Sequence, residues 1–441
     1  MKQYPTYKES GVQWIGLIPE HWNVTKTKYI ARLYTGNSLD DSQKEKYLTD
    51  PLEINESAIP YIATKDISSD CNCVTYYNGL AIPKEEGFKK APKGSFLLCV
   101  EGGSAGRKHA YLEHEVCFVN KLCCFDSSLN SRYHYYFIQT EPFRNHFKQM
   151  IQGLIGGVSV SDLNNMEVVV PSDSEQQAIA QFLDSKTAKI DESVLLYEQQ
   201  KADLVEYRKA LVSDTVTRGL NPNVPLKDSG IQWLGQIPEE WNVVPLKSLL
   251  RLLTDGTHQT PTYIDSGIPF ISIKDMSSGT IDFSDTKYIS EEEHAILSQH
   301  APVEKGDILF SRIGTLGVFI KVDTDKVFDI FVSLGLMKII EGSIDTDFLV
   351  YYLSSLSVRR YIDIVKAGEG TSAAKFNLTD VGRTSIVIPS LAEQQAIVSF
   401  LDTKTTMIDE AIHRIDEQIA DLKAYRTALI TDAVTGKIDV R

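Results

Sequence analysis

The chain repeats itself, and this duplication constrains its fold more than any other feature. Residues 9–24 (ESGVQWIGLIPEHWNV) match residues 228–243 (DSGIQWLGQIPEEWNV) at 11 of 16 positions. Residues 175–192 (EQQAIAQFLDSKTAKIDE) match residues 393–410 (EQQAIVSFLDTKTTMIDE) at 13 of 18 positions. The two offsets, 219 and 218 residues, are close to half of the 441-residue length. A repeat with this period predicts one structural copy in each half of the chain.

The segments between the matching pieces have diverged. Residues 25–170 and 244–388 share only short pieces, such as IPYIATKDIS at 59–68 and IPFISIKDMS at 268–277. A catalytic unit that was duplicated for its chemistry would keep the same polar residues in both copies, whereas two modules that recognise different targets would not. The pattern therefore favours a retained scaffold that carries two modules of similar fold and different surface.

Length and charge agree with this organisation and narrow the function. A single hydrophobic core rarely grows beyond about 250–300 residues, so two or more domains are expected. The net charge of −14 argues against a protein that binds nucleic acid merely because it is basic. Residues 1–171 have a net charge of −1 and residues 212–389 a net charge of −7, so only the first module has room for a basic face. Residues 1–11 are polar and no run of eighteen apolar residues occurs, so we expect a soluble, cytoplasmic protein.

Each half of the chain ends in a long predicted helix. Residues 172–175 and 390–393 are Ser-x-x-Glu capping boxes that follow a proline, and they predict the two helix starts. Apolar residues then recur at heptad spacing, which predicts an apolar seam on each helix. The seam positions are Leu183, Ile190, Tyr197, Leu204 and Leu211 in the first copy and Leu401, Ile408, Ile415, Leu422 and Leu429 in the second. An arginine, Arg208 or Arg426, interrupts the seam at the same point of both copies.

A single apolar seam must be buried against another part of the chain. Each helix could pack on its own module, but we favour pairing of the two helices with each other, antiparallel about a pseudo-twofold axis. A helix from Glu175 to Leu211 would be roughly 55 Å long. The modules would then lie at opposite ends of the pair and inverted, an arrangement that suits two half-sites on a DNA duplex.

Both modules are predicted to mix strands with short helices, so the fold class is α+β: two mixed β/α domains separated by two long helices. Short apolar runs bounded by Gly, Asp and Ser indicate strands, and amphipathic patterns indicate helices. The strands are expected at 168–170, 308–310 and 385–388, and the helices at 133–138, 142–151, 347–355 and 358–365.

Glycine-rich polar loops follow the second helix of each module, at residues 153–161 and 368–377. Such loops let the backbone approach a phosphate, although they could equally be flexible surface connections. Arg and Lys on loops suit guanine edges and Asn and Gln suit adenine edges, although each such residue could also be a solvated surface group. The predicted DNA-contact residues are Thr64, Lys65, Arg107, Lys108 and Ser159 in the first module and Thr257, His258, Gln259, Lys274, Arg312, Thr371, Lys375 and Asn377 in the second.

No catalytic motif is present. The sequence contains no Gly-x-x-x-x-Gly-Lys-Ser/Thr loop, no His-Glu-x-x-His pair and no Gly-x-Ser-x-Gly elbow, so we predict no catalytic residues and no bound metal. All six cysteines lie in the first half: Cys71, Cys73, Cys99, Cys117, Cys123 and Cys124. Four of them could ligate zinc, but their spacing is not that of a familiar zinc site. We interpret the cysteines as buried apolar thiols.

The repeated opening segment carries two tryptophans and a proline in each copy. These residues are Trp14, Pro19 and Trp22 in the first copy and Trp233, Pro238 and Trp241 in the second. We predict that they attach each module to the long helices, with docking of a partner protein as the alternative.

Together these motifs resemble a known family. The doubled SGxQWxGxIPExWNV opening, the doubled EQQAIxxFLDxKTxxID helix, and the pieces DGTHQTPTY, GIPFISIKD and SRIGTLG resemble the specificity subunit of type I restriction-modification systems. The resemblance covers essentially the whole chain. It implies that each module is a target recognition domain that reads one half of a split double-stranded DNA sequence. It also implies that the helices form an antiparallel coiled coil, which sets the gap between the halves through contacts at Leu183, Ile190, Leu204, Leu401, Ile408, Ile415 and Leu422.

The resemblance further implies partners and a division of labour. Two methyltransferase subunits would dock on this chain and two ATP-driven restriction subunits would join them, so S-adenosylmethionine, ATP and Mg²⁺ would belong to the partners. This chain would carry no cofactor, would not be an enzyme and would contact no membrane. The expected domains are 1–171 (recognition domain 1, with segment 9–24), 172–218 (helical spacer 1), 219–389 (recognition domain 2, with segment 228–243) and 390–441 (helical spacer 2). A protein-binding adaptor and a stand-alone DNA-modifying enzyme remain the alternatives.

Overall fold

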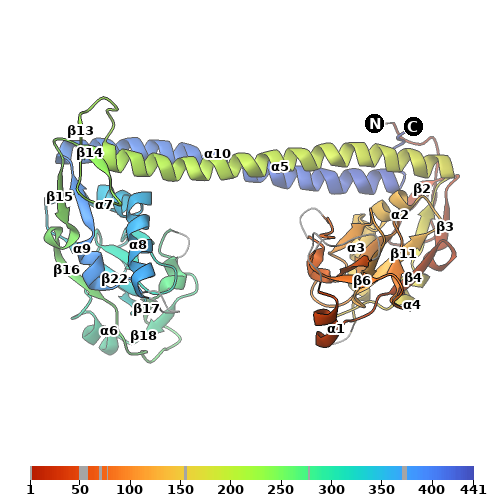
Figure 1. Cartoon of the computed structure of the whole chain (residues 1–441), viewed down its shortest axis with the longest axis horizontal. Helices are drawn as coiled ribbons and strands as arrows, with labels where there is room; N and C mark the ends of the chain where they lie inside the picture. Colours follow the sequence, from red (N-terminus) through yellow and green to blue (C-terminus); the bar gives the residue numbers. More distant parts are fainter. Residues whose placement is uncertain are drawn as a thin grey trace. The chain divides into compact units, whose positions relative to one another are not determined.

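The computed structural model describes residues 2–48, 58–68, 72–76, 78–152, 156–276, 279–369 and 375–441. They form two compact units whose limits differ from those of the sequence repeat. The first unit contains Met1–Glu198 and Asp416–Arg441, and the second contains Gln199–Ile415. Each unit therefore combines one module with helical segments from both copies of the repeat (Figure 1).

The module of the first unit is built on two four-stranded sheets. One sheet has the strand order β4-β11-β8-β9 with antiparallel neighbours, and the other has the order β6-β5-β10-β7 with a parallel β5-β10 pair. Two-stranded pairs β1-β2 and β3-β12 complete the strands. The bounds are β1 Tyr7–Glu9, β2 Leu17–Pro19, β3 Asn23–Lys26, β4 Ala31–Thr35, β5 Ala58–Ile62, β6 Ala81–Pro83, β7 Lys90–Ala91, β8 Phe96–Cys99, β9 His109–Tyr111, β10 Val116–Phe118, β11 Leu122–Ser127 and β12 Glu167–Val170. The helices are α1 Asp41–Lys46, α2 Ser131–Phe137, α3 Glu141–Met150 and α4 Val160–Asn165.

The module of the second unit repeats this plan. Its four-stranded sheet has the order β16-β22-β19-β20, and a three-stranded sheet β18-β17-β21 contains the matching parallel pair. The pairs β13-β14 and β15-β23 correspond to β1-β2 and β3-β12. The bounds are β13 Leu226–Asp228, β14 Gln236–Pro238, β15 Asn242–Pro245, β16 Leu250–Asp255, β17 Ile268–Ile271, β18 Lys287–Ile289, β19 Ile308–Ser311, β20 Phe319–Lys321, β21 Asp329–Ile330, β22 Leu334–Ile339 and β23 Ser385–Ile388. The helices are α6 Glu291–Leu297, α7 Thr346–Leu353, α8 Leu356–Glu369 and α9 Leu378–Arg383.

The predicted α+β class is confirmed, together with the elements on which it rested. The expected helices correspond to α2, α3, α7 and α8, and the expected strands correspond to β12, β19 and β23. The predicted domain limits stay a prediction. None of the helices in the described residues is long and apolar enough to cross a membrane.

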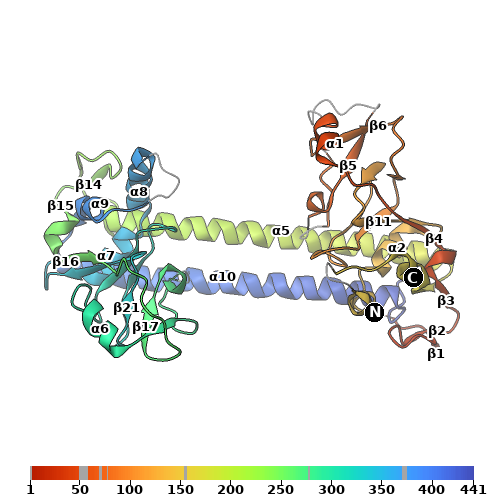
Figure 2. The same ribbon diagram turned by 90° about the horizontal axis from the view of Figure 1, so that it is seen from below.

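The two long helices, α5 (Asp173–Arg218) and α10 (Leu391–Val434), pair antiparallel within each unit (Figure 2). In the first unit, Arg426 Nε lies 2.8 Å from Asp191 Oδ1 and Lys423 Nζ lies 3.5 Å from Glu198 Oε1, so residue numbers rise along one helix as they fall along the other. The arginines that interrupt the two seams have equivalent partners. Arg208 in the second unit lies 2.9 Å from Asp409 Oδ1, and Asp409 is the repeat counterpart of Asp191.

Six of the ten predicted seam residues are buried, and the other four, including Tyr197 and Leu211, are half-buried. Leu183, Ile190, Leu401, Ile408 and Ile415 are buried, whereas Leu204 and Leu422 are half-buried. In the first unit the seam of α5 shares one hydrophobic cluster with the end of α10 and with module residues such as Tyr133. The helices therefore pack on each other and, near their ends, on a module, so the two alternatives drawn from the sequence coexist.

A tryptophan–glutamate contact joins each opening segment to a helix start. Trp22 Nε1 donates to Glu175 Oε1 at 3.3 Å, and Trp241 Nε1 donates to Glu393 Oε2 at 3.1 Å. The predicted attachment is confirmed for these two tryptophans. For the other two it stays a prediction: Trp14 stacks on His146 of α3 and lines a pocket with Thr431 of α10, and Trp233 packs on Tyr361 of α8.

Glu175 collects more hydrogen bonds than its counterpart. Ser172 donates its backbone N–H at 3.2 Å and its hydroxyl at 2.6 Å to Oε2, and His21 Nε2 lies 2.8 Å from Oε1. Burial alone would raise the pKa of Glu175, but the hydrogen bonds from Ser172, His21 and Trp22 outweigh it and lower the pKa to about 2.

We predict that Glu175→Gln lowers the free energy of unfolding by about 1–3 kcal/mol at neutral pH, because hydrogen bonds to a charged acceptor are lost. The folded pKa lies below the ordinary value of 4.5, so this stabilisation is present above pH 4.5 and is lost as the pH falls towards 2. Chemical denaturation across this range should show the wild-type and variant curves converging. Glu393→Gln, which removes the charge from an acceptor of one indole hydrogen bond, is the matched control. A gap between wild type and Glu175→Gln that stays constant from pH 6 to pH 2 contradicts the assignment.

Candidate nucleic-acid interface

The two modules place their variable residues on the same backbone frame, which begins where the strands β4 and β16 end. A glycine follows each strand, Gly36 or Gly256. A Cβ atom at Gly36 would overlap the carbonyl oxygen of Phe118, and one at Gly256 would overlap that of Ile330. Both positions thus require glycine for the same close approach of backbone to backbone. The preceding residues, Thr35 and Asp255, are therefore equivalent.

The next part of the frame follows β8 and β19. Val158 N donates to Val100 O at 2.9 Å, and Phe376 N donates to Arg312 O at 2.9 Å. Isolated bridges then join Glu101 to Gly157 and Ile313 to Lys375. Ser159 and Asn377 are also equivalent, because they are the N-cap residues of α4 and α9. The equivalent pairs are therefore Val100 with Arg312, Glu101 with Ile313, Gly157 with Lys375, and Ser159 with Asn377.

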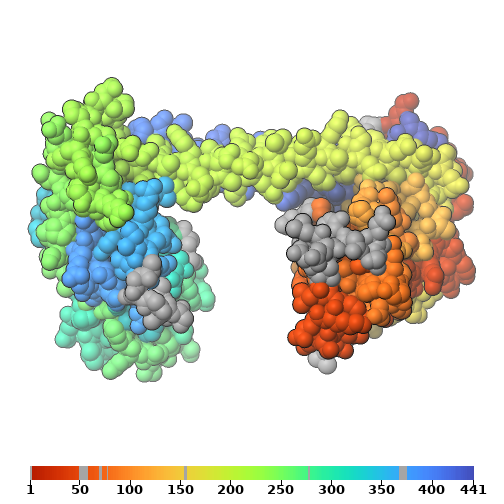
Figure 3. Space-filling model, in the orientation of Figure 1, coloured from red at the N-terminus to blue at the C-terminus, as the bar shows by residue number. Residues whose placement is uncertain are grey.

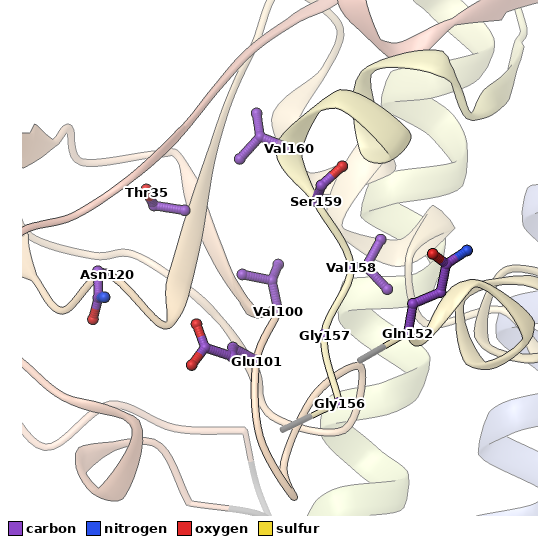
Figure 4. Close-up of a pocket in the computed structure, with 10 residues that line it drawn as sticks. All are labelled: Thr35, Val100, Glu101, Asn120, Gln152, Gly156, Gly157, Val158, Ser159 and Val160. Atoms are coloured by element: carbon purple, nitrogen blue, oxygen red, sulfur yellow. The ribbon is translucent and has the colours of Figure 1, made fainter. Parts of the chain in front are cut away.

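In the first module this frame surrounds an open pocket of about 660 Å³. Its lining is formed by Thr35, Val100, Glu101, Asn120, Gln152, Gly156, Gly157, Val158, Ser159 and Val160 (Figure 4). Glu101 extends toward the side of the pocket on which Asn120 lies. Among the described residues, none forms a hydrogen bond or ion pair with the carboxylate of Glu101. The pocket thus presents a free acceptor and neutral amides.

A basic cleft of about 830 Å³ adjoins this pocket, and Gly156 lines both. We use the name basic cleft for the space between the turn Gly102–Lys108 and helix α3. Its charged side chains are Arg107, Lys108, Arg144 and Lys148, and no acidic residue is part of its described lining. Lys108 Nζ donates to Thr64 O at 2.9 Å, which fixes that ammonium group at the cleft. Four cations around glycine backbone suit the phosphates of a nucleic acid.

The second module has a charged cluster at the equivalent place, built on a buried arginine–aspartate pair. The side chain of Arg312 contacts the carboxylate of Asp255, and these residues are only 8% and 7% exposed. His258 Nε2 lies 3.0 Å from Asp255 Oδ2, and His300 Nε2 lies 3.8 Å from Asp255 Oδ1. Burial lowers the pKa of Arg312 from its ordinary value. Asp255 therefore holds a cationic group from each of three segments when the histidines are protonated.

The basic cleft has a less positive counterpart in the second module. In the second module, Arg359 of α8 lies close to the turn at Gly317. In the first module, Phe147 of α3 lies close to the corresponding turn at Gly106, and Arg144 of the same helix lines the basic cleft. Arg359 Nη1 donates to Leu316 O at 3.0 Å, and its Nε lies 3.4 Å from Asp363 Oδ1. Asp363 thus offsets the charge of Arg359, whereas Arg144 in the first module has only cations among the charged residues of the cleft.

The structure brings most of the predicted contact residues into these two places. In the first module, the basic cleft or the pocket is lined by Arg107, Lys108 and Ser159, and Thr64 O accepts a hydrogen bond from Lys108. In the second module, the frame around Asp255 carries Thr257, His258, Arg312, Lys375 and Asn377. Gln259 is exposed, and its backbone N–H donates to Thr257 Oγ1 at 3.2 Å, whereas exposed Lys65 belongs to neither place by any described contact. Thr371 lies outside the described residues. The contact role of every one of these residues stays a prediction.

Lys274 is less available than the sequence suggested. Its ammonium group donates to Asp285 O at 2.6 Å and to Asp285 Oδ2 at 3.2 Å, and it lies 3.6 Å from Asp275 Oδ1. These acidic partners offset the charge that a DNA contact would use.

Sequence reasoning did not single out several residues that line these sites. They are Thr35, Glu101, Asn120, Arg144, Lys148, Gln152 and Asp255. A search for positions at which the two repeats place different polar groups would have found them, but it needs a correct alignment of the modules. The turn after β8 is two residues longer than the turn after β19, as the bonds Cys99 N to Lys108 O and Ser311 N to Val318 O show.

The cysteines fit the interpretation as buried thiols at four positions. Cys99, Cys117, Cys123 and Cys124 are free and buried, and burial raises the pKa of Cys117 and of Cys123 to about 12. Cys73 is exposed and lies in a disulfide, so the interpretation is wrong there. Cys71 lies outside the described residues. Over the described ranges, no group of three or more His, Cys, Asp and Glu side chains is placed to hold a metal ion.

The sequence profile of a family described as the type I restriction modification DNA specificity domain matches residues 19–195 and 238–420. The chain belongs to this family. Its sequence is 23% identical to the specificity subunit of the type I restriction enzyme EcoBI of Escherichia coli, over 87% of this chain and 81% of that protein. It is 21% identical to the EcoKI specificity subunit of Escherichia coli strain K12, over 96% of this chain and 90% of that protein. The predicted family resemblance is confirmed.

Solved structures of the family share the fold. A chain from a structural study of type I restriction-modification complex assembly matches with a TM-score of 0.71 at 15% identity, over 96% of this chain and 99% of that chain. The HsdS subunit of Thermoanaerobacter tengcongensis matches with a TM-score of 0.52 at 16% identity, over 98% of this chain and all of that chain. The two segments of this chain that match the family profile, residues 19–195 and 238–420, fall on the two copies of the repeat.

Proposed function

We propose that this chain is the DNA-recognition subunit of a type I restriction-modification complex, in which each module reads one half of a bipartite target. The observation that carries this function is the shared frame with unlike side chains, such as Val100 opposite Arg312 and Gly157 opposite Lys375. Family membership supplies the reaction context. The paired helices set the gap between the half-sites. The chain itself is not catalytic, and S-adenosylmethionine, ATP and Mg²⁺ act in its partner subunits.

The direct test maps methylated adenines in DNA treated with this chain and its cognate methyltransferase subunits. We expect one split sequence with a constant gap to be methylated, and no methylation with this chain alone. Methylation by the isolated chain would instead support a stand-alone enzyme. Binding of polypeptides that duplex DNA does not displace would support the adaptor alternative.

The basic cleft is the part of the chain best suited to phosphate contact. We predict that the double variant Arg107→Gln, Lys148→Gln weakens binding to specific and non-specific duplexes by a similar factor. Two lost phosphate contacts should reduce the slope of log affinity against log salt concentration by about 2. Fluorescence anisotropy from 50 to 300 mM salt measures that slope. The control Lys44→Gln, Lys84→Gln removes the same charge from exposed sites outside the cleft, and an equal change in its slope would contradict the assignment.

Each long helix presents an exposed aromatic residue at the same point of the repeat. Tyr207 is 56% exposed and Tyr425 is 50% exposed, and each precedes the arginine of an interhelical ion pair. Figure 3 shows side chains of α5 exposed on the face that is turned to the viewer. A repeated exposed tyrosine is not needed for the buried seam and suits an interface anchor. We assign the two tyrosines to docking of two copies of one partner, the methyltransferase subunit.

We predict that Tyr207→Ala with Tyr425→Ala weakens methyltransferase binding by roughly thirtyfold, the effect of losing an interface anchor. The thermal unfolding midpoint should change little, because both side chains are exposed. Calorimetric titration measures affinity and stoichiometry, and each single variant should impair one of two sites. Met407→Ala, at a residue that is 56% exposed and has Lys189 as its repeat counterpart, is the control. Equal losses in Met407→Ala would refute the docking role.

A further inference from the structure

The two modules carry opposite hydrogen-bonding character at neighbouring positions of the frame. The first module has a carboxylate, Glu101, beside Val100 and Gly157, whereas the second has Arg312 and Lys375 beside Ile313. We propose that Glu101 reads the exocyclic amino group of a cytosine in one half-site, and that the Arg312–Lys375 pair reads the acceptor edge of a guanine in the other. This inference rests on the proposed function and assigns its specificity-determining residues.

The geometry around Glu101 supports a role as a hydrogen-bond acceptor for a base. Its backbone is fixed by the bridge to Gly157, and the neighbouring Gly102 N donates to Gly156 O at 2.8 Å. Its carboxylate extends into a pocket that is open to solvent, and no described residue pairs with it. An ionised carboxylate can only accept hydrogen bonds, and in the major groove the cytosine N4 amino group is the donor that it suits.

The second module holds donors at the neighbouring frame positions, where Arg312 and Lys375 correspond to Val100 and Gly157. Arg312 is more than nine-tenths buried, Asp255 fixes its position, and its Nε has no hydrogen-bond partner among the described residues. A buried donor without a partner is costly, so an acceptor supplied by a ligand would satisfy it. Lys375 is exposed, and its backbone pairs with Ile313, directly after Arg312. Arginine and lysine donors suit the O6 and N7 acceptors of guanine.

The basic cleft adds a reason to place DNA at this corner. Gly156 lines both the cleft and the Glu101 pocket. A phosphate backbone held by Arg107 and Lys148 would therefore run beside the carboxylate. Phosphate contacts would fix the register of the duplex, while Glu101 would distinguish the base.

The test maps the methylation specificity of the complete methyltransferase complex carrying wild type, Glu101→Gln, Glu101→Lys or Lys375→Gln. Each wild-type half-site should require a G·C pair at one position or more. Glu101→Gln should lower the preference at one such position by roughly ten- to hundredfold and leave the other half-site unchanged. Glu101→Lys should favour guanine where wild type requires cytosine on the same strand. Lys375→Gln should relax one guanine in the other half-site only. These variants change an exposed lysine or a pocket-lining glutamate, so we expect the fold to be preserved. Arg312 is left unchanged because it is buried.

Glu85→Gln and Lys247→Gln, at exposed residues outside the frame, are the matched controls. A wild-type complex that methylates no split site refutes the proposed function itself. A mapped split site overturns only the inference if Glu101→Gln behaves as Glu85→Gln does, loses activity uniformly at all positions, or relaxes an A·T pair. A Lys375→Gln variant that behaves as Lys247→Gln does, or that alters the same half-site as Glu101→Gln, also overturns it.

Discussion

The antiparallel pairing of the two long helices is the constraint on which the rest of the structure depends. It places the start of α5 and the end of α10 in the same hydrophobic cluster, so Leu183 of one repeat and Val434 of the other complete a single core. Tyr133 links the module strand β12 to helix α10, because its hydroxyl lies 2.9 Å from Val169 O and 3.4 Å from Val434 O. Neither repeat contains all the residues of its own unit. The chain therefore folds as an exchange between two copies, which explains why the helices stay similar while the modules diverge.

The frame that holds the variable residues depends little on their identity. Its fixed points are backbone hydrogen bonds, such as Val158 N to Val100 O, and glycines, such as Gly36, that no other residue can replace without overlap. Substituting the side chain at Val100 or at its counterpart Arg312 leaves those bonds in place. A surface built in this way can change its hydrogen-bonding pattern without rebuilding its fold. This property is what a pair of recognition modules for unlike targets requires.

Features that rest on local rules could be predicted from the sequence, and features that rest on long-range pairing could not. The heptad seam, the capping boxes and the contacts of Trp22 and Trp241 with helix starts follow from spacing and repetition. Arg312 was identifiable as a polar loop residue, but its burial against Asp255 depends on two strands that are distant in sequence. Glu101 gave no signal, because one carboxylate in a glycine-rich stretch is ordinary. Trp14, in the loop between β1 and β2, stacks on His146, and the spacing of the tryptophans does not predict this contact between distant segments.

The unequal charge of the modules has a mechanistic consequence. In the first module the basic cleft combines four cations, so phosphate neutralisation can supply much of the binding free energy. In the second module, Arg359 is paired with Asp363, and the buried Lys338 lies 2.7 Å from both Asp307 and Glu304. These two cations thus already have acidic partners, and residues 212–389 carry a net charge of −7. Under the proposed function, the second half-site must therefore be held mainly by contacts to bases or by positive charge on a partner subunit.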